Sequence, residues 1–213
     1  MPKNPHQGAP VSRFGAPLAS ARVAAILVHG RDQSPSVMHE AVVDRLGLGD
    51  VAYVAPEAEG RTWYPAGFMA DIADNEPRLS FALDRMAALS EALEAEGVPP
   101  SKQVLVGFSQ GACLACESVY RRRRRFGALI AFTGGLIGPP GTEWTAETDA
   151  FRDMPVLLGG DRADPWVPAA RMLDTAAVFQ KLGARVAINL YASLGHVIGD
   201  EQIAHARAIF ADV

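Results

Sequence analysis

The chain has 213 residues, of which 49% are hydrophobic and 21% are charged. These values are typical of a packed globular protein and exclude an intrinsically disordered chain. The formal net charge of −4 gives no electrostatic reason to expect nucleic acid as a partner. No apolar run reaches the length that spans a bilayer, so we expect no stable membrane insertion.

The first residues are rich in proline, glycine and polar side chains and lack the apolar core of a secretion signal. We expect a flexible tail over residues 1–17 and a single domain over residues 18–213. Nothing in the composition requires an oxidising compartment, so the default expectation for the location is cytoplasmic.

Apolar runs suited to buried strands alternate with segments of helical periodicity along the rest of the chain. Strands are predicted at 22–28, 51–55, 103–106, 128–132, 156–158 and 186–191. Helices are predicted at 79–93, 112–120, 169–182 and 201–210. This alternation predicts an α/β fold with a mostly parallel central sheet, because continuous apolar strands are expected when helices cover both faces.

Three further features of the chain each allow a structural or a functional role. Cys113 and Cys116 are spaced like half of a metal site, but no second pair completes it, so we expect two buried thiols and no metal. The run Arg121 to Arg125 is interpreted as a solvated helix end, with an anionic lipid surface as the alternative. Residues 136–150 show little periodicity and are expected to form an excursion over the sheet edge or near the site.

The sharpest signal is Gly107-Phe108-Ser109-Gln110-Gly111, which follows a predicted strand and precedes a predicted helix. This strand–turn–helix context is that of the nucleophile elbow in the α/β-hydrolase fold. The sharp turn lifts the serine hydroxyl clear of the sheet, and the helix N-terminus favours developing negative charge. We therefore expect Ser109 to be the nucleophile.

A serine nucleophile needs a base, which in this fold comes last along the chain, after the acid. Only His196 and His205 follow Ser109. His196 comes just after the last predicted strand and is the expected base, whereas His205 lies in a helical pattern. His29 precedes Ser109, so we expect a structural role for it.

The acid should follow the strand at 156–158, where Asp161 and Asp164 compete. Asp161 follows two glycines directly and is suited to pinning the turn by accepting local N–H groups. Asp164 lies deeper in the loop, nearer the next helix. Position alone favours Asp164 only slightly, and its role would be to hold one tautomer of the base.

Two backbone N–H groups are expected to form the oxyanion hole. One belongs to the residue after the nucleophile, Gln110, and the other to the loop after an early strand, where Arg31 is the candidate. The predicted chemistry requires no metal and no cofactor.

At these residues the sequence resembles the phospholipase/carboxylesterase family, which includes acyl-protein thioesterase-like enzymes and a bacterial branch of small esterases. The matching segments are LVHGR, GFSQGA, DPWVP and GHVI. The resemblance implies that Asp164 in DPWVP is the catalytic acid. It also implies cofactor-free hydrolysis of carboxylic esters, with lysophospholipase or acyl-protein thioesterase activity as alternatives. Dienelactone hydrolases share the architecture but use a cysteine where this chain has Ser109.

Aromatic and apolar side chains near the expected catalytic face suggest a pocket for short to medium acyl chains. The candidates are Trp63, Tyr64, Phe68, Phe108, Leu136 and Trp166. The expected partner is a small-molecule ester, and the sequence leaves open whether the chain forms a homodimer. A member of a different class, a non-catalytic small-molecule binder of the same fold, is the competing hypothesis.

Overall fold

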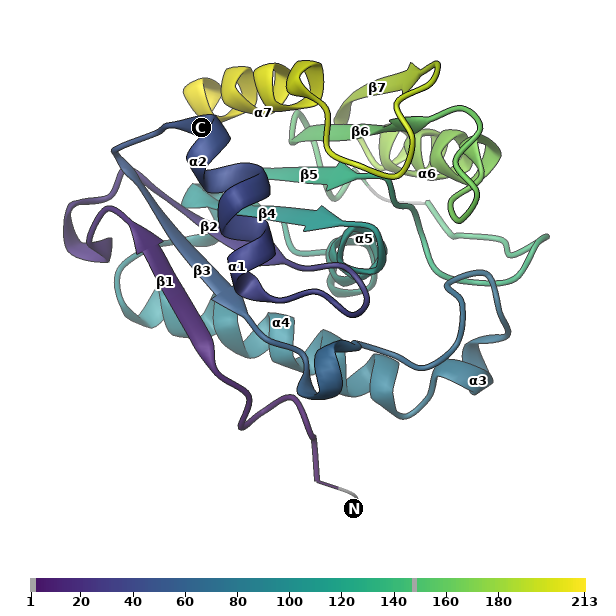
Figure 1. Ribbon diagram of the computed structural model, residues 1–213, viewed down its shortest axis with the longest axis horizontal. Coiled ribbons are helices and arrows are strands. Elements are labelled where there is room, and N and C mark those ends of the chain that lie inside the picture. Colours follow the sequence, from purple (N-terminus) through teal and green to yellow (C-terminus); the bar gives the residue numbers. More distant parts are fainter. Residues whose placement is uncertain (1–2, 147–148) are drawn as a thin grey trace.

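The computed structural model describes residues 3–146 and 149–213. Its centre is one seven-stranded sheet with the strand order β1-β3-β2-β4-β5-β6-β7 (Figure 1). The strands are β1 (Val11–Gly15), β2 (Val23–Val28), β3 (Val51–Pro56), β4 (Gln103–Phe108), β5 (Ala128–Phe132), β6 (Pro155–Asp161) and β7 (Arg185–Tyr191). Strands β2 to β7 pair in parallel, and β1 alone is antiparallel to its neighbour.

The prediction of a flexible tail over residues 1–17 is wrong for its second half. Strand β1 lies in that segment and pairs with β3, with Val11 opposite Pro56 and Gly15 opposite Ala52. The exposed edge of β3 offers unpaired backbone groups, and an additional strand satisfies them whatever the local composition of that strand. Upstream of β1, His6 is fully buried.

Helices cover both faces of the sheet, as predicted (Figure 1). The helices of more than four residues are α4 (Arg78–Ala95), α5 (Gln110–Arg122), α6 (Ala169–Lys181) and α7 (Asp200–Asp212). A further helical stretch, not predicted, runs through α1 (Pro35–Met38), a π-helical turn (His39–Val43) and α2 (Asp44–Leu46), and a short α3 spans Ile72–Asn75.

Alternating side chains of the buried strands define two hydrophobic cores. On β2, Ala24, Ile26 and Val28 join the core beneath α4, α5 and α6. Val23, Ala25 and Leu27 face the other core, which α7 and the helical stretch from α1 to α2 cover. The two-residue period of a strand explains this division and why β2 reads as a continuous apolar run.

The parallel arrangement brings the carboxyl ends of β2, β4, β6 and β7 to one edge of the sheet. The loops that follow these strands carry the candidate residues Arg31, Ser109, Asp164 and His196. Across the described parts of the chain, no helix has the length and apolar character needed to cross a membrane.

Candidate active site

Ser109 lies between β4 and α5 in a backbone conformation that side chains rarely adopt, with φ of 54° and ψ of −120°. The turn is tight on both sides. A Cβ at Gly107 would lie 2.4 Å from the Gly111 carbonyl oxygen, and one at Gly111 would lie 2.1 Å from the Val28 carbonyl oxygen. Glycine is therefore required at both positions, and the strained serine presents its hydroxyl at the N-terminus of α5.

The loop after β7 brings the His196 imidazole to the serine. The distance from His196 Nε2 to Ser109 Oγ is 2.8 Å. The ring is packed against Phe108, with 5.1 Å between the ring centroids. His205 lies elsewhere, on α7, where its Nδ1 contacts the Asn189 side chain at 2.9 Å.

Asp164 completes the hydrogen-bonded chain from the loop after β6. Its Oδ2 lies 2.7 Å from His196 Nδ1. Its other oxygen accepts the backbone N–H groups of Trp166 and Val167, both at 2.8 Å. A carboxylate can only accept, so His196 Nδ1 carries the hydrogen and Nε2 is free to accept the serine proton.

Asp161 binds the backbone of the two loops that carry Asp164 and His196. Its Oδ1 accepts the Ala163 N–H at 2.7 Å and its Oδ2 accepts the Gly195 N–H at 2.6 Å. These backbone donors lower the pKa of the Asp161 carboxyl, Ala163 having the largest effect. Because Gly195 precedes His196, Asp161 ties the loop of the base to the loop of the acid. The structure thus places Asp164, and not Asp161, against the imidazole.

Arg31 and Gln110 both line the cavity above Ser109. Gln110 is the first residue of α5, so its backbone N–H has no acceptor one turn earlier. For Arg31, the hydrogen bonds of the described residues include no acceptor of its backbone N–H. The Gln33 side chain accepts the Gly30 N–H at 3.0 Å and so fixes the loop between them.

Side chains of both candidates also organise the loop after β3. The Arg31 guanidinium donates to the carbonyl oxygens of residues 64, 65 and 66 at 2.8–3.0 Å. Gln110 Nε2 donates to the Tyr64 carbonyl at 2.8 Å, and Gln110 Oε1 accepts the Trp63 N–H at 3.0 Å. The oxyanion candidates and the aromatic loop are therefore one connected unit.

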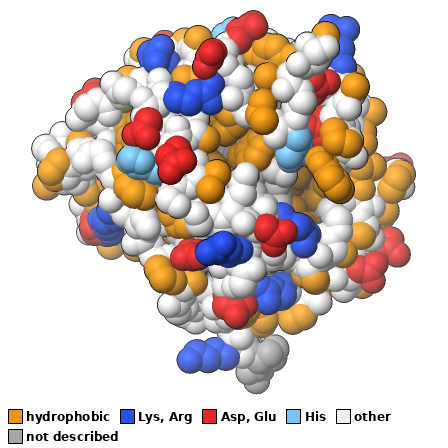
Figure 2. All heavy atoms as spheres, viewed as in Figure 1, with side chains coloured by type: hydrophobic (Ala, Val, Ile, Leu, Met, Phe, Trp, Pro, Cys, Tyr) orange, Lys and Arg blue, Asp and Glu red, His pale blue; other side chains and the backbone are white. Residues whose placement is uncertain are grey.

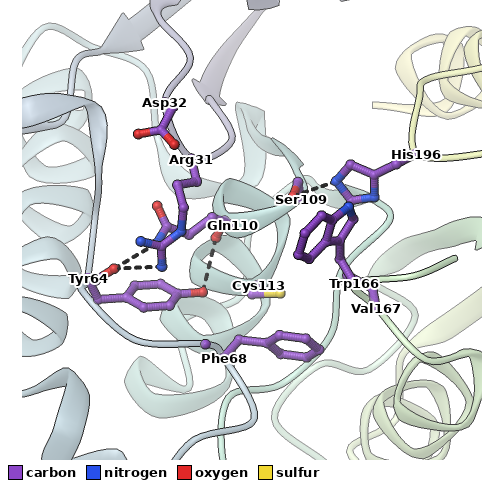
Figure 3. Close-up of a pocket in the computed structure, with 11 residues that line it drawn as sticks. Arg31, Asp32, Tyr64, Phe68, Ser109, Gln110, Cys113, Trp166, Val167 and His196 are labelled. Carbon is purple, nitrogen blue, oxygen red and sulfur yellow. Dashed lines mark hydrogen bonds between the residues drawn. The ribbon is translucent and has the colours of Figure 1, made fainter.

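A cavity of about 370 Å³ opens above Ser109 and His196. Of the six predicted substrate residues, Tyr64, Phe68 and Trp166 line it (Figure 3). Tyr64 is buried, Phe68 half-buried and Trp166 exposed. Figure 2 shows cationic and anionic side chains mixed over the visible face, with no single-sign patch there.

The other three predicted substrate residues lie outside the cavity lining, and each is a correction. Trp63 is fully buried and donates its indole N–H to the His29 carbonyl at 2.8 Å. Phe108 is packed against the His196 ring instead of facing the cavity. Leu136 is fully buried in the core beneath α5 and α6. Aromatic and apolar side chains serve core packing as readily as a pocket, and composition alone does not separate the two uses.

Four lining residues were not predicted: Asp32, Gly67, Cys113 and Val167. Val167 belongs to the DPWVP segment. Cys113 lies one helical turn after Ser109, and this i, i+4 spacing on α5 is the signal that would have placed it beside the nucleophile. Burial raises the pKa of its thiol to about 12, so Cys113 contributes an uncharged wall.

The loop after β3 is held by two buried histidines. The Trp63 ring contacts the rings of both His6 and His29, at centroid distances of 5.5 and 5.0 Å. His29 Nε2 accepts the Ala58 N–H at 3.0 Å, which gives His29 a structural role. Burial lowers the pKa of both histidines, and that of His6 falls to about 4.

The five arginines of residues 121–125 all have partners within the chain. They contact Glu117, Asp84, the Thr145 carbonyl, Glu94 and the Arg152 carbonyl, in sequence order. These contacts tie the end of α5 to α4 and to the segment that follows β5. Three of the five arginines are therefore paired with carboxylates, and the other two bind backbone carbonyls.

Within residues 3–146 and 149–213, no group of three or more histidine, cysteine, aspartate or glutamate side chains is arranged to hold a metal ion. The candidate catalytic groups that the structure brings together are the hydroxyl of Ser109, the imidazole of His196 and the carboxylate of Asp164.

Comparison with known proteins gives a consistent picture. The model of a family described as phospholipase/carboxylesterase matches residues 16–211. A solved structure titled as a phospholipase/carboxylesterase from Dyadobacter fermentans is 30% identical, has a TM-score of 0.86, and the match covers 96% of this chain and 97% of that one.

Curated relatives match over shorter stretches. A probable carboxylesterase from Oryza sativa is 29% identical over 145 residues, which is 67% of this chain and 60% of that protein. An acyl-protein thioesterase 1 from Gibberella zeae is 28% identical over 113 residues, 53% of this chain and 48% of that protein. The matched stretch therefore spans about half to three fifths of these relatives' length.

Proposed function

The chain belongs to the phospholipase/carboxylesterase family of α/β-hydrolases, and from this premise we propose that it hydrolyses carboxylic esters through an acyl-enzyme on Ser109. The observation that carries the proposal is the chain of hydrogen bonds from Asp164 through His196 to Ser109, at 2.7 and 2.8 Å. This chain ends at the floor of an open cavity, where a reacting carbonyl can reach the hydroxyl.

In the first half of the proposed reaction, Ser109 Oγ attacks the ester carbonyl carbon while His196 Nε2 takes the hydroxyl proton. Asp164 stabilises the imidazolium that forms. The carbonyl oxygen gains negative charge, and the backbone N–H groups of Arg31 and Gln110 are the proposed donors to it. Collapse of the tetrahedral intermediate breaks the ester bond, and His196 returns the proton to the departing alcohol.

In the second half, water takes the place of the alcohol. His196 removes a proton from the water as its oxygen attacks the acyl-enzyme carbonyl, and the same N–H groups hold the oxyanion. The intermediate then releases the carboxylic acid, and Ser109 Oγ recovers its proton from His196. The cycle begins and ends with neutral His196 and consumes one water.

The cavity supports short to medium acyl groups as the substrate class. Much of its lining is apolar or uncharged, formed by Tyr64, Phe68, Cys113 and Val167. A volume of about 370 Å³ lies at the small end of the range for ligand pockets. Trp166 is 71% exposed at the mouth and can contact the leaving group.

Thioesters are a second candidate, because the Gibberella zeae relative is named an acyl-protein thioesterase and the same acyl transfer serves a thiol leaving group. Lysophospholipids would use the same chemistry. We also propose a cytoplasmic location, which suits two buried and unpaired cysteines and is tested by cell fractionation.

The proposed function is tested with p-nitrophenyl esters from acetate to dodecanoate, with a matched acyl-thioester series and a fluorophosphonate probe. We expect ester hydrolysis and labelling by the wild type and neither by Ser109→Ala, which retains the fold. A wild type that hydrolyses no ester or thioester and does not react with the probe would make the non-catalytic binder the better hypothesis.

A further inference from the structure

Phe68 is an aromatic side chain of the cavity lining. In Figure 3, Cys113 and Phe68 lie below Ser109, whereas Asp32 lies above and to its left. Cys113 and Tyr64 are almost fully buried, whereas Asp32 and Arg31 are exposed. An acyl group on Ser109 would therefore extend past Cys113 towards Phe68, and the alcohol would face the open side.

Arg171 of α6 lies against the ring of Phe68. Its guanidinium carbon is 5.8 Å from the centroid of the Phe68 ring and 5.0 Å from that of Trp144. Arg171 is only 3% exposed, although arginine is among the residues least often buried. It does not line the cavity above Ser109, whereas Phe68, whose ring it contacts, does.

Arg171 also lines a second cavity, of about 460 Å³. Trp144, Asp174, Val178 and Lys181 contribute to its lining. Phe68 thus lines the cavity above Ser109, and Arg171, which contacts Phe68, lines the second cavity. The pair of side chains connects the linings of the two spaces.

Backbone carbonyls hold Arg171 in place. Its guanidinium donates to the carbonyl oxygens of Leu136, Gly138 and Pro139, at 2.9, 2.8 and 3.2 Å. Burial lowers the pKa of Arg171, and the three carbonyl acceptors compensate part of the cost of burying its charge. The same segment also grips Phe68 directly, because the Gly138 N–H donates to the Phe68 carbonyl at 2.9 Å.

We propose that Arg171 is a positioning residue that sets the longest acyl group the site accepts, by fixing Phe68 as a wall of the cavity above Ser109. The inference rests on the proposed esterase function. Without the guanidinium fork, the segment 136–139 and Phe68 lose a common anchor. The acyl end then extends towards the second cavity, and longer chains gain buried methylenes.

The test compares kcat/KM for p-nitrophenyl decanoate and butyrate in the wild type, Arg171→Lys, Arg171→Ala and Phe68→Ala. We expect the decanoate-to-butyrate ratio to rise in all three variants, by up to about fourfold for each methylene that becomes buried. A general loss of active protein lowers both rates equally and leaves the ratio unchanged, so the ratio separates positioning from a merely structural role.

Two further comparisons sharpen the test. In the double variant Phe68→Ala/Arg171→Lys, the ratio should rise no further than in Phe68→Ala alone, because both changes act on one wall. The control is Arg207→Lys. Arg207 lies on α7 and, like Arg171, donates to backbone carbonyls, in this case two, at 3.1 and 2.7 Å. Its ratio should equal that of the wild type.

The outcomes are distinguishable. If Arg171→Ala does not fold, Arg171→Lys and Phe68→Ala decide the question. A wild type without hydrolysis or fluorophosphonate labelling contradicts the proposed function itself. An active wild type whose ratio is unchanged in folded Arg171→Lys, or that changes additively in the double variant, overturns the role of Arg171 alone.

Discussion

Two segments follow neighbouring strands at the same edge of the sheet and are held in opposite ways. After β6, the loop from Asp161 to Pro168 is fixed mainly by its own aspartates, which accept N–H groups two or three residues away. After β5, residues 136–139 receive their partners from helices distant in the sequence. Glu117 of α5 accepts the Ile137 N–H, and Thr175 and Arg171 of α6 hold the residues around it.

The difference corresponds to two tasks. In the acid loop, short-range bonds use one oxygen of Asp164 and leave the other free to hold His196. In the segment after β5, long-range bonds involve the buried side chains of Glu117 and Arg171, and the segment in turn holds the backbone of Phe68. Bonds between nearby residues thus position a candidate catalytic side chain, and bonds between distant residues position a side chain of the cavity lining.

The largest predicted effect comes from the acid loop. Asp164→Asn should lower kcat by about 10³–10⁴-fold, because an amide no longer fixes the His196 tautomer or stabilises the imidazolium. Steady-state kinetics with p-nitrophenyl butyrate measure the loss, and thermal denaturation confirms that the variant is folded. Near-normal activity in Asp164→Asn would remove this residue from the proposed triad.

This contrast also explains how far the sequence could predict the molecule. The order of strands and long helices follows from periodicity, and Ser109 and His196 follow from the elbow motif and the chain order. Asp164 was separated from Asp161 mainly by resemblance to the DPWVP segment. In each case the signal lies within a few consecutive residues, as do the bonds that shape the acid loop.

Features made by distant partners could not be predicted. The conformation of residues 136–139 depends on Glu117, Arg171 and Thr175, and nothing in the sequence of this segment shows that three helix side chains will satisfy its backbone. Strand β1 was missed because the open edge of β3 creates it. Trp63 and Leu136 were assigned to the pocket because an apolar residue carries no sign of which neighbour will cover it.

The second prediction concerns the segment after β5. Glu117→Leu removes the acceptor of the buried Ile137 N–H and the partner of Arg121. Leaving a buried donor unsatisfied and an ion pair broken should lower the free energy of unfolding by about 2–4 kcal/mol. Urea denaturation measures the change. At temperatures where the variant stays folded, kcat for p-nitrophenyl acetate should remain within a few-fold of the wild type, in contrast to Asp164→Asn.

The third prediction separates the two aspartates. In Asp161→Asn, the amide has a single oxygen and cannot accept the Ala163 and Gly195 N–H groups at the two positions that the carboxylate oxygens occupy. The loop that carries His196 should therefore lose its anchor. We expect kcat to fall by roughly tenfold, which is far less than for Asp164→Asn, because the residue acts through the position of His196. Equal losses in the two variants, or a greater loss in Asp161→Asn, would reverse the assignment of acid and anchor.

The smallest predicted effect concerns the loop after β3, another segment held from a distance, here by His6. Burial lowers the pKa of His6 from 6.5 to about 4, so the folded protein keeps this imidazole neutral while the unfolded chain binds a proton below pH 6.5. The contribution of His6 is therefore fully present above pH 6.5 and is lost as the pH falls towards 4. Linkage gives a decrease in unfolding free energy of about 1 kcal/mol between pH 6.5 and roughly pH 5.5.

His6→Gln, whose amide can still bind the Trp63 carbonyl and the Glu59 N–H, should make the unfolding free energy less dependent on pH in this range. Urea denaturation at a series of pH values measures both slopes, and identical slopes in the two proteins would show that His6 is not the group that titrates.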